Sequence, residues 1–159
     1  MRGPARQLVH DLKYRYARVS APVMAELMRD LPAALAIDRF FPVPLHRSRE
    51  KSRGFNQSAL LLKHAGWGPV SADLRRVRRT DRQVGSAFAE RRTNVGGAFA
   101  YSGARLDGLT VAVVDDVITT GATVAECAAV LKDAGARHVW AFSFARASYD
   151  YASEAAIED

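Results

Sequence analysis

The stretch VAVVDDVITTGATVAEC, residues 111–127, combines an apolar run, two adjacent carboxylates and a loop rich in threonine and glycine. The apolar run at 110–114 is typical of a buried strand, and the pattern over 123–134 predicts a helix that ends at Gly135. A second apolar run at 138–145 predicts another strand. Because a helix connects the two strands, they are expected to be parallel. The sequence therefore predicts an α/β fold with a mostly parallel sheet flanked by helices.

The remainder of the chain predicts further elements of one compact domain. Apolar residues at helical spacing predict two opening helices, over 8–19 and 23–31, the second beginning after Ser20 and Pro22. The other expected elements are a short buried strand at 40–43, a polar segment at 46–57, a helix over 55–63, and strands at 72–77 and 98–101. We divide the domain into an N-terminal helical segment (1–36), a core (37–147) and an acidic tail (148–159).

Composition narrows the class of protein. The chain has 159 residues, of which 48% are hydrophobic, so it is long enough for a real core. No apolar run approaches the roughly 20 residues that cross a bilayer, and the N-terminus lacks the apolar part of a secretory signal, which favours a soluble cytoplasmic protein. The single cysteine, Cys127, excludes an internal disulfide and a cysteine-based zinc cluster, and its place on the predicted helix favours a core residue.

Positive charge is in excess and is unevenly distributed. The chain has 23 Lys and Arg against 17 Asp and Glu, a formal net charge of +6. The basic residues concentrate in two segments, 47–53 and 75–92. Because such segments attract anions, the partner is expected to be a nucleotide, a phosphorylated metabolite or a nucleic acid.

The loop after the strand at 110–114 has the features of an anion cradle. It lies at the carboxyl end of a parallel strand, where open α/β sheets bind ligands. Gly121 permits a left-handed backbone, and the helix that follows points its unpaired N–H groups into the loop. Threonine hydroxyls add donors, so a phosphate monoester is expected to be held by Thr119, Thr120, Gly121, Ala122 and Thr123.

The two carboxylates before the loop need a different ligand group. When ionised, Asp115 and Asp116 only accept hydrogen bonds, so they suit the hydroxyls of a sugar rather than a phosphate. The alternative is that the pair merely caps the following turn. Because a hydroxyl-binding pair precedes a phosphate cradle within nine residues, the joint pattern predicts a ribose 5-phosphate ligand.

Three segments in this order carry a resemblance to a known family. VVDDVITTGAT (113–123) resembles the phosphoribosyl pyrophosphate (PRPP) motif of type I phosphoribosyltransferases. PVPLHRSREKSRGFNQ (42–57) and RRTDRQVGSAFAERRTNVGGAF (78–99) resemble the competence protein F (ComF) family, whose members carry such a transferase-like domain. LVHDLKYRY (8–16) is similar to that family too. The resemblance thus spans nearly the whole chain and implies a type I phosphoribosyltransferase-like fold.

The resemblance also implies roles for individual residues. Asp115 and Asp116 would hold the ribose hydroxyls, and the loop 119–123 would hold the 5-phosphate. The turn after the first core strand usually binds pyrophosphate with magnesium, which places Leu45, His46 and Arg47 there, with added charge from Arg49, Lys51 and Arg53. Magnesium would be held through PRPP and not by the protein directly. The Arg-rich segment resembles a lid over PRPP, with Arg78, Arg79, Arg82, Gln83 and Arg91 as its candidate residues.

The implied chemistry is displacement at C1 of the ribose with release of pyrophosphate, for which the sequence identifies no catalytic residue and no pocket for an acceptor. Two alternatives stay open: a PRPP or nucleotide sensor without turnover, and a competence factor that binds single-stranded DNA and serves DNA uptake in natural transformation. Family members commonly carry a zinc-binding segment ahead of the transferase-like domain, and we find no such segment in this sequence. Homodimer formation also stays open.

Overall fold

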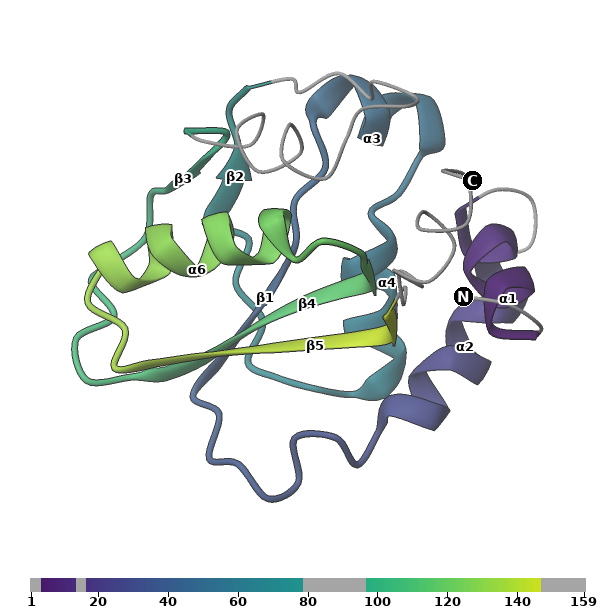
Figure 1. Ribbon diagram of the computed structural model, residues 1–159, viewed down its shortest axis with the longest axis horizontal. Coiled ribbons are helices and arrows are strands. Elements are labelled where there is room, and N and C mark those ends of the chain that lie inside the picture. Colours follow the sequence, from purple (N-terminus) through teal and green to yellow (C-terminus); the bar gives the residue numbers. More distant parts are fainter. Residues whose placement is uncertain (1–3, 14–16, 79–96, 147–159) are drawn as a thin grey trace, which may run out of the picture.

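A three-stranded parallel sheet forms the centre of this computed structural model, which describes residues 4–13, 17–78 and 97–146 (Figure 1). The strands lie in the order β1–β4–β5, with bounds β1 (Arg39–Pro42), β4 (Thr110–Ile118) and β5 (His138–Arg146). β4 pairs with β1 on one side and with β5 on the other, both in parallel. The carboxyl ends of all three strands therefore meet at one edge of the sheet. The predicted α/β class and parallel sheet are confirmed.

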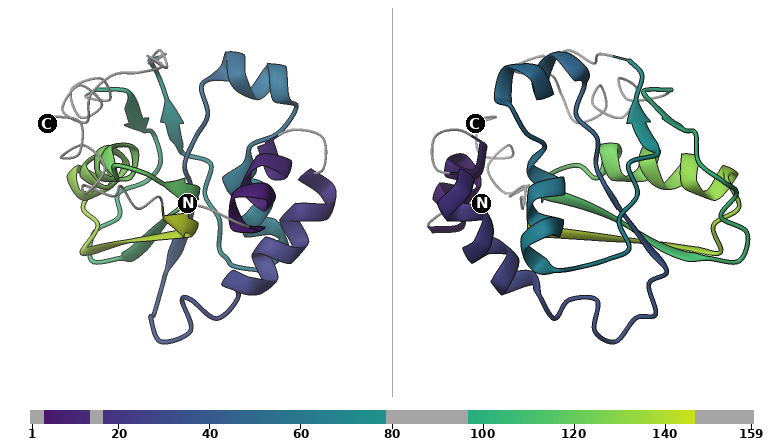
Figure 2. Two further views of the ribbon diagram at one scale, coloured as in Figure 1. Left: turned by 45° about the vertical axis from the view of Figure 1, so that its right-hand side comes forward. Right: turned by 180° about the vertical axis from the view of Figure 1, so that it is seen from behind.

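Helices cover both faces of this sheet (Figure 2). α1 (Pro4–Lys13), α2 (Ala17–Met28) and α4 (Gln57–Ala65) lie on one side, and α6 (Ala122–Asp133) lies on the other. Alternate residues of β4 divide between two cores. Ala112 and Val114 pack with α1, α2 and α4, whereas Val111 and Val113 pack with α6. The continuous apolar run at 110–114 is thus what a strand buried on both faces requires.

A separate two-stranded ribbon packs against α6. It consists of β2 (Leu74–Arg76) and β3 (Phe99–Tyr101), which pair antiparallel. Leu74 and Phe99 are buried in the same core as Cys127 of α6, which anchors the ribbon there. The strands predicted at 72–77 and 98–101 are confirmed with shorter bounds, but they form their own sheet and do not join the parallel one.

The opening helices differ from their predicted bounds. The helix predicted at 8–19 is divided between α1 and α2, and α2 runs through Pro22, where the sequence predicted a helix start. Met24 of α2 is fully buried against the sheet side, so tertiary packing maintains the helix across the proline. Val23 and Leu27, which helped to predict this helix, face outward instead.

The polar segment predicted after β1 contains a helix, α3 (Arg47–Arg53). None of its residues is buried, so the hydrophobic pattern offered no signal for it. Local interactions hold it: His46 Nδ1 accepts a hydrogen bond from Ser48 N–H at 3.3 Å, and Gly54 N–H donates to Glu50 O at 2.7 Å. Gly54 ends the helix at φ 82°, a left-handed conformation that suits glycine. The capping residues, rather than core packing, therefore stabilise this helix.

None of the helices in the described ranges is long and apolar enough to cross a membrane. The predicted acidic tail, 148–159, lies outside the described residues, and the division of the domain at residue 36 stays a prediction.

Candidate functional site

A hollow lies at the carboxyl end of β4, between this strand and the first turn of α6. Its volume is about 200 Å³, which includes space open to solvent. It is lined by Asp115 and by residues 117–124, which form the end of β4, the following loop and the start of α6. The structure therefore brings the predicted cradle and one of the two predicted acids together at the ligand-binding edge of an α/β sheet.

The loop leaves backbone donors of α6 available. Gly121 adopts φ 79°, which glycine tolerates without strain, and it caps α6 without a side-chain hydrogen bond. Ala122 N–H donates to Thr120 Oγ1 at 3.3 Å. Within the described part of the chain, the N–H groups of Thr123 and Val124 have no acceptor. The amino end of α6 thus offers free donors and the positive end of its dipole to an anion.

All the residues predicted to cradle a phosphate line this one hollow, namely Thr119, Thr120, Gly121, Ala122 and Thr123. The side chain of Thr119 is exposed, and the other four residues are partly buried. The arrangement fits a phosphate monoester, and the contact itself stays a prediction.

The two acids lie inside β4 and not after its end. Sequence reasoning ended the strand at residue 114, but pairing with β5 continues to Ile118. Because neighbouring residues of a strand point to opposite faces, the side chains of the two acids point in different directions. Asp115 lines the hollow, whereas Asp116 does not line it and is only 6% exposed. The structure therefore gives the two carboxyl groups different surroundings.

Asp115 is held by two donors and has an altered acidity. Its Oδ1 accepts hydrogen bonds from Asp116 N–H at 2.8 Å and from Ser58 Oγ at 3.1 Å. Burial raises the pKa of Asp115 to about 7, and the negative charge of Asp116 contributes in the same direction. Near neutral pH, the carboxyl group of Asp115 is therefore divided between its protonated and ionised forms.

Ser58 belongs to α4, and sequence reasoning missed it. Asn56 caps α4 by accepting from Ser58 N–H at 2.9 Å, and Asn56 Nδ2 donates to Val43 O at 3.0 Å. The start of α4 is thereby tied to the end of β1, which places Ser58 next to Asp115. The polar residues around an N-cap are visible in the sequence, but their contact with a strand 57 positions later is not.

One side-chain oxygen at this end of the sheet is buried and accepts no hydrogen bond from the described residues. It is Gln57 Oε1, at the start of α4. Buried polar atoms are nearly always satisfied in folded proteins, so such atoms concentrate where ligands bind or where water enters. Gln57 was also not identified from the sequence as a site residue.

The basic turn predicted to bind pyrophosphate follows β1. Leu45 and His46 lie in the turn, and the four cationic residues belong to α3: Arg47, Arg49, Lys51 and Arg53. Because β1 and β4 are parallel neighbours, this turn emerges at the same sheet edge as the cradle. The side chains of Arg47 and Lys51 are exposed, while those of Arg49 and Arg53 are partly buried. Their role with pyrophosphate stays a prediction.

Arg76 of β2 is a further cation, which belongs to the basic segment 75–92 but was not among the residues predicted for the PRPP site. Its guanidinium lies 5.3 Å from the centre of the Phe99 ring. Burial lowers the pKa of Arg76 and the charge of Arg49 lowers it further, whereas Cys127 and Asp115 act in the opposite direction. The charges of Arg49 in α3 and of Asp115 in β4 thus act on Arg76 electrostatically.

Most of the predicted lid lies outside the described residues, namely Arg79, Arg82, Gln83 and Arg91. Arg78 is described: its side chain is exposed, and its N–H donates to Ala98 O at 3.4 Å at the end of the ribbon. The lid therefore stays a prediction.

Cys127 is a core residue, as predicted. Its side chain is fully buried in α6, and burial raises the pKa of its thiol to about 12. A thiol of this kind is inert as a nucleophile. In the described ranges, no cluster of three or more His, Cys, Asp or Glu side chains could hold a metal ion.

The comparisons with known proteins identify the family. No family model matches the chain. The DNA utilization protein YhgH of Salmonella typhi is 36% identical over 154 residues, which span 90% of this chain and 67% of that protein. Competence protein F of Haemophilus influenzae is 35% identical over 116 residues, 69% of this chain and 51% of that protein. The chain belongs to the ComF (competence protein F) family.

Solved structures resemble this ComF-family chain in fold. Glutamine PRPP amidotransferase from B. subtilis matches 78% of this chain and 26% of its own, with 20% identity and a TM-score of 0.48. A hypoxanthine phosphoribosyltransferase from Trypanosoma cruzi matches 92% of this chain and 86% of its own, with 9% identity and a TM-score of 0.44. At these sequence identities, the likeness concerns the fold alone.

Proposed function

We propose that this chain binds PRPP and that magnesium enters the site with the pyrophosphate of the ligand. The hollow at the end of β4 carries the proposal, because it combines a carboxylate with free N–H groups of a helix. A carboxylate accepts from hydroxyls and repels phosphate, whereas N–H donors at a helix start attract phosphate. A ribose 5-phosphate meets both requirements in one molecule.

We assign the pyrophosphate end of the ligand to the turn after β1. Leu45, His46 and Arg47 form the contact surface, with charge from Arg49, Lys51 and Arg53 of α3. Arg76 of β2 adds a partly buried cation that interacts electrostatically with Asp115. Several cations at this turn suit a ligand that carries a pyrophosphate group with bound magnesium.

The proposed reaction is transfer of the phosphoribosyl group with release of pyrophosphate. The cations of α3 and β2 would stabilise the negative charge that develops on the departing group. Magnesium bound to the pyrophosphate would neutralise part of the same charge. A PRPP sensor without turnover is the alternative use of the same site.

Calorimetric titration tests the binding proposal. PRPP with magnesium is titrated into the wild type, the Asp115→Asn, Asp116→Asn double variant, and an Asp107→Asn control at the opposite end of the sheet. We expect binding by the wild type and the control and none by the double variant. Equal binding by all three proteins would exclude the acidic pair from the site.

Release of pyrophosphate separates the transferase from the sensor. The wild type is incubated with PRPP, magnesium and a panel of nucleobases and amines, and pyrophosphate is measured. Release that depends on an acceptor supports the transferase. Tight PRPP binding without release for any acceptor supports the sensor.

Binding of single-stranded DNA is a second candidate function. Two observations favour it: the net charge of +6, and relatives named for DNA utilization and competence. Contacts with DNA phosphates weaken steeply with salt. We expect salt-dependent binding that is lost when Arg75, Arg76, Arg78 and Arg79 are replaced by alanine. Binding that is insensitive to salt would argue against it.

A further inference from the structure

Ser58 makes a direct contact with the carboxylate that lines the hollow. It is 3% exposed, and its Oγ donates to Asp115 Oδ1 at 3.1 Å. The other donor to this oxygen is Asp116 N–H, at 2.8 Å. A carboxyl oxygen with two donors at these distances is fixed in orientation. Ser58 is thus the side chain that links α4 to the proposed sugar site.

Ser58 is itself held in place by the start of α4. Its N–H donates to Asn56 Oδ1 at 2.9 Å, and Asn56 Nδ2 donates to Val43 O just after β1. Ser58 also lies in the first turn of α4, where the helix dipole favours a nearby negative charge. The contact with Asp115 therefore rests on a rigid connection between two neighbouring strands and a helix.

The groups around Asp115 have opposite effects on its pKa. Burial and the carboxylate of Asp116 favour the protonated acid, whereas the hydrogen bonds from Ser58 and from the backbone favour the carboxylate. Arg76 of β2 also attracts the ionised form. Cys127 of α6 stays a neutral thiol because burial raises its pKa to about 12. Among these groups, Ser58 supplies a hydrogen bond without adding charge.

We infer that Ser58 is a positioning residue: it orients Asp115 toward the hollow and keeps this carboxyl group ionised when the sugar hydroxyls bind. The inference rests on the proposed binding of PRPP, because only a ligand with hydroxyls needs the carboxylate form. Removal of the Ser58 hydroxyl favours the protonated acid. Binding of PRPP then requires a higher pH than in the wild type.

The test compares Ser58→Ala with a matched control. Ser71→Ala removes a similar contact elsewhere, since Ser71 is 9% exposed and its Oγ donates to Asp73 Oδ2 at 2.8 Å. PRPP affinity with magnesium is measured from about pH 5.5 to about pH 8.5 by calorimetry. For Ser58→Ala we expect about 3- to 10-fold weaker binding at neutral pH and a pH midpoint that rises by about 0.5 to 1. The control should keep the wild-type midpoint.

A uniform loss of affinity at every pH would overturn the inference, because a merely structural role leaves the midpoint unchanged. Ser58→Cys provides a second variant if Ser58→Ala does not fold. Its thiol is a weaker donor, so it should show a smaller rise of the midpoint. A wild-type midpoint for both variants would likewise overturn the inference.

A ligand-free measurement separates this inference from the proposed function. Carboxyl ¹³C NMR follows the titration of Asp115 in the wild type and in Ser58→Ala without PRPP. A midpoint that rises in the variant supports the role of Ser58 in setting the charge of Asp115, even if PRPP does not bind. An unchanged midpoint would overturn that role, whatever the ligand is.

Discussion

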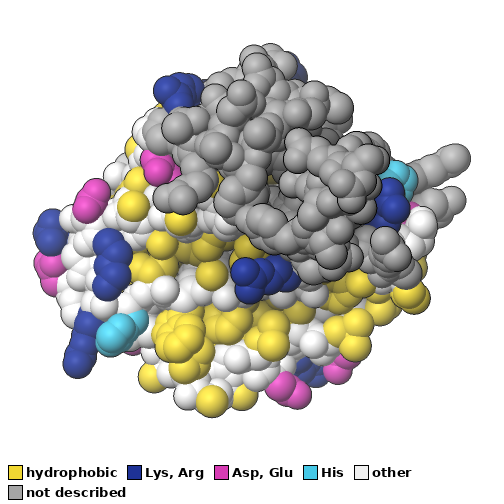
Figure 3. All heavy atoms as spheres, viewed as in Figure 1, with side chains coloured by type: hydrophobic (Ala, Val, Ile, Leu, Met, Phe, Trp, Pro, Cys, Tyr) yellow, Lys and Arg dark blue, Asp and Glu magenta, His cyan; other side chains and the backbone are white. Residues whose placement is uncertain are grey.

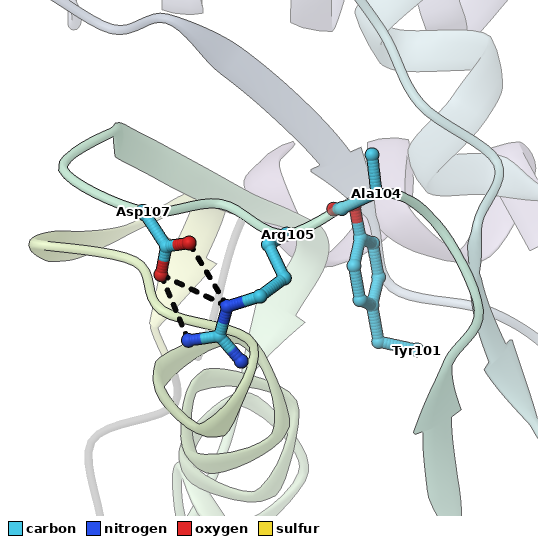
Figure 4. A network of polar contacts seen from close by, with 4 residues as sticks. All are labelled: Tyr101, Ala104, Arg105 and Asp107. Carbon is cyan, nitrogen blue, oxygen red and sulfur yellow. Dashed lines mark hydrogen bonds and ion pairs between the residues drawn. The ribbon is translucent and has the colours of Figure 1, made fainter.

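The two ends of the parallel sheet differ in the hydrogen bonding of their polar groups. At the carboxyl end, Gln57 Oε1 is buried without a donor, and the N–H groups of Thr123 and Val124 in α6 lack acceptors within the described ranges. At the amino end, polar groups are paired (Figure 4). Arg105 Nε and Nη2 both donate to Asp107 Oδ1, at 3.0 and 2.8 Å, and Tyr101 Oη donates to Ala104 O at 2.7 Å.

Pairing at the amino end extends to the backbone. Asp38 N–H donates to Thr110 O, and Thr110 N–H donates to Asp38 Oδ2, both at 2.8 Å, so β1 and β4 start in a closed loop of hydrogen bonds. Lys132 Nζ donates to Arg137 O across the turn before β5. A polar group that is satisfied within the protein stabilises the fold, whereas one left unsatisfied is available to a ligand. The difference supports the proposal that the carboxyl end binds the ligand, which we call the binding end, and we call the amino end the structural end.

The surface shows a related contrast. On the face seen in Figure 3, hydrophobic side chains gather in the lower half, over β5, whereas Lys and Arg side chains lie scattered over the face. Trp140 of β5 contributes to the exposed hydrophobic surface, with 44% of its area accessible. Part of the exposed hydrophobic surface on this face therefore lies along the sheet.

The largest expected effect is at the binding end. Asp115→Asn should weaken PRPP binding by about 10- to 100-fold, because a neutral amide replaces the carboxylate that accepts the sugar hydroxyls. The same variant should be as stable as the wild type or more stable near pH 8, since it removes a buried charge. Calorimetry and urea unfolding measure the two effects. If Asp115→Asn lost stability but kept the wild-type affinity for PRPP, Asp115 would belong to the fold and not to the binding site.

Gly135→Ala tests the structural end. Gly135 has φ 107°, and a Cβ there would collide with the Asp107 carboxylate and approach Arg105 Nη2 to 2.9 Å. We expect a loss of about 1–3 kcal/mol in the free energy of unfolding, with unchanged PRPP affinity in the folded protein. Urea unfolding provides the measurement. A loss of affinity comparable with that of Asp115→Asn would show that the two ends are not independent.

The pH dependence of stability should report on Asp115. Its pKa is raised to about 7 in the folded protein, against about 4 for an unfolded chain. The folded state therefore binds the extra proton between these values. This contribution to stability is complete below about pH 4 and is lost as the pH rises through about 7, by about 4 kcal/mol. Asp115→Asn should remove this part of the slope, and an identical slope in the variant would contradict the raised pKa.

Gly121→Ala should have a smaller effect on stability. No atom lies within 4 Å of an added Cβ, so only the left-handed φ of 79° opposes alanine, at a cost of about 1 kcal/mol. Because this residue sets the direction of the first N–H groups of α6, PRPP affinity should fall by about 10-fold. Thermal unfolding and calorimetry measure both. Wild-type affinity would mean that the cradle does not depend on this backbone conformation.

Asp107→Asn should give the smallest change. The contact with Arg105 lowers the pKa of Asp107, but both side chains are exposed to solvent, where ion pairs contribute little. We expect a slight decrease in melting temperature that disappears at high salt, and no change in PRPP affinity. A large loss of stability would indicate that this pair holds the turn before β4 more tightly than exposed pairs usually do.

The class of the fold and the residues of the cradle could be predicted from local sequence patterns. The apolar run at 110–114, the helix that ends before Gly135, and the run at 138–145 follow from local periodicity, which does not depend on distant contacts. Residues 119–123 are contiguous, so their grouping in one hollow needed only the strand–loop–helix geometry. α3 also has local causes, its two caps, which a search for apolar patterns does not detect.

The different surroundings of the two acids, and the contacts that distant side chains make with them, could be seen only once the chain had folded. Whether Asp115 or Asp116 faces the hollow depends on where pairing with β5 ends, and this is a contact between strands. Ser58 donates a hydrogen bond to Asp115 from α4, and Arg76 acts on it electrostatically from β2. No local sequence pattern predicts either interaction. The altered pKa of Asp115 has the same origin, because burial and neighbouring charge arise only once β4, α4 and the ribbon pack together.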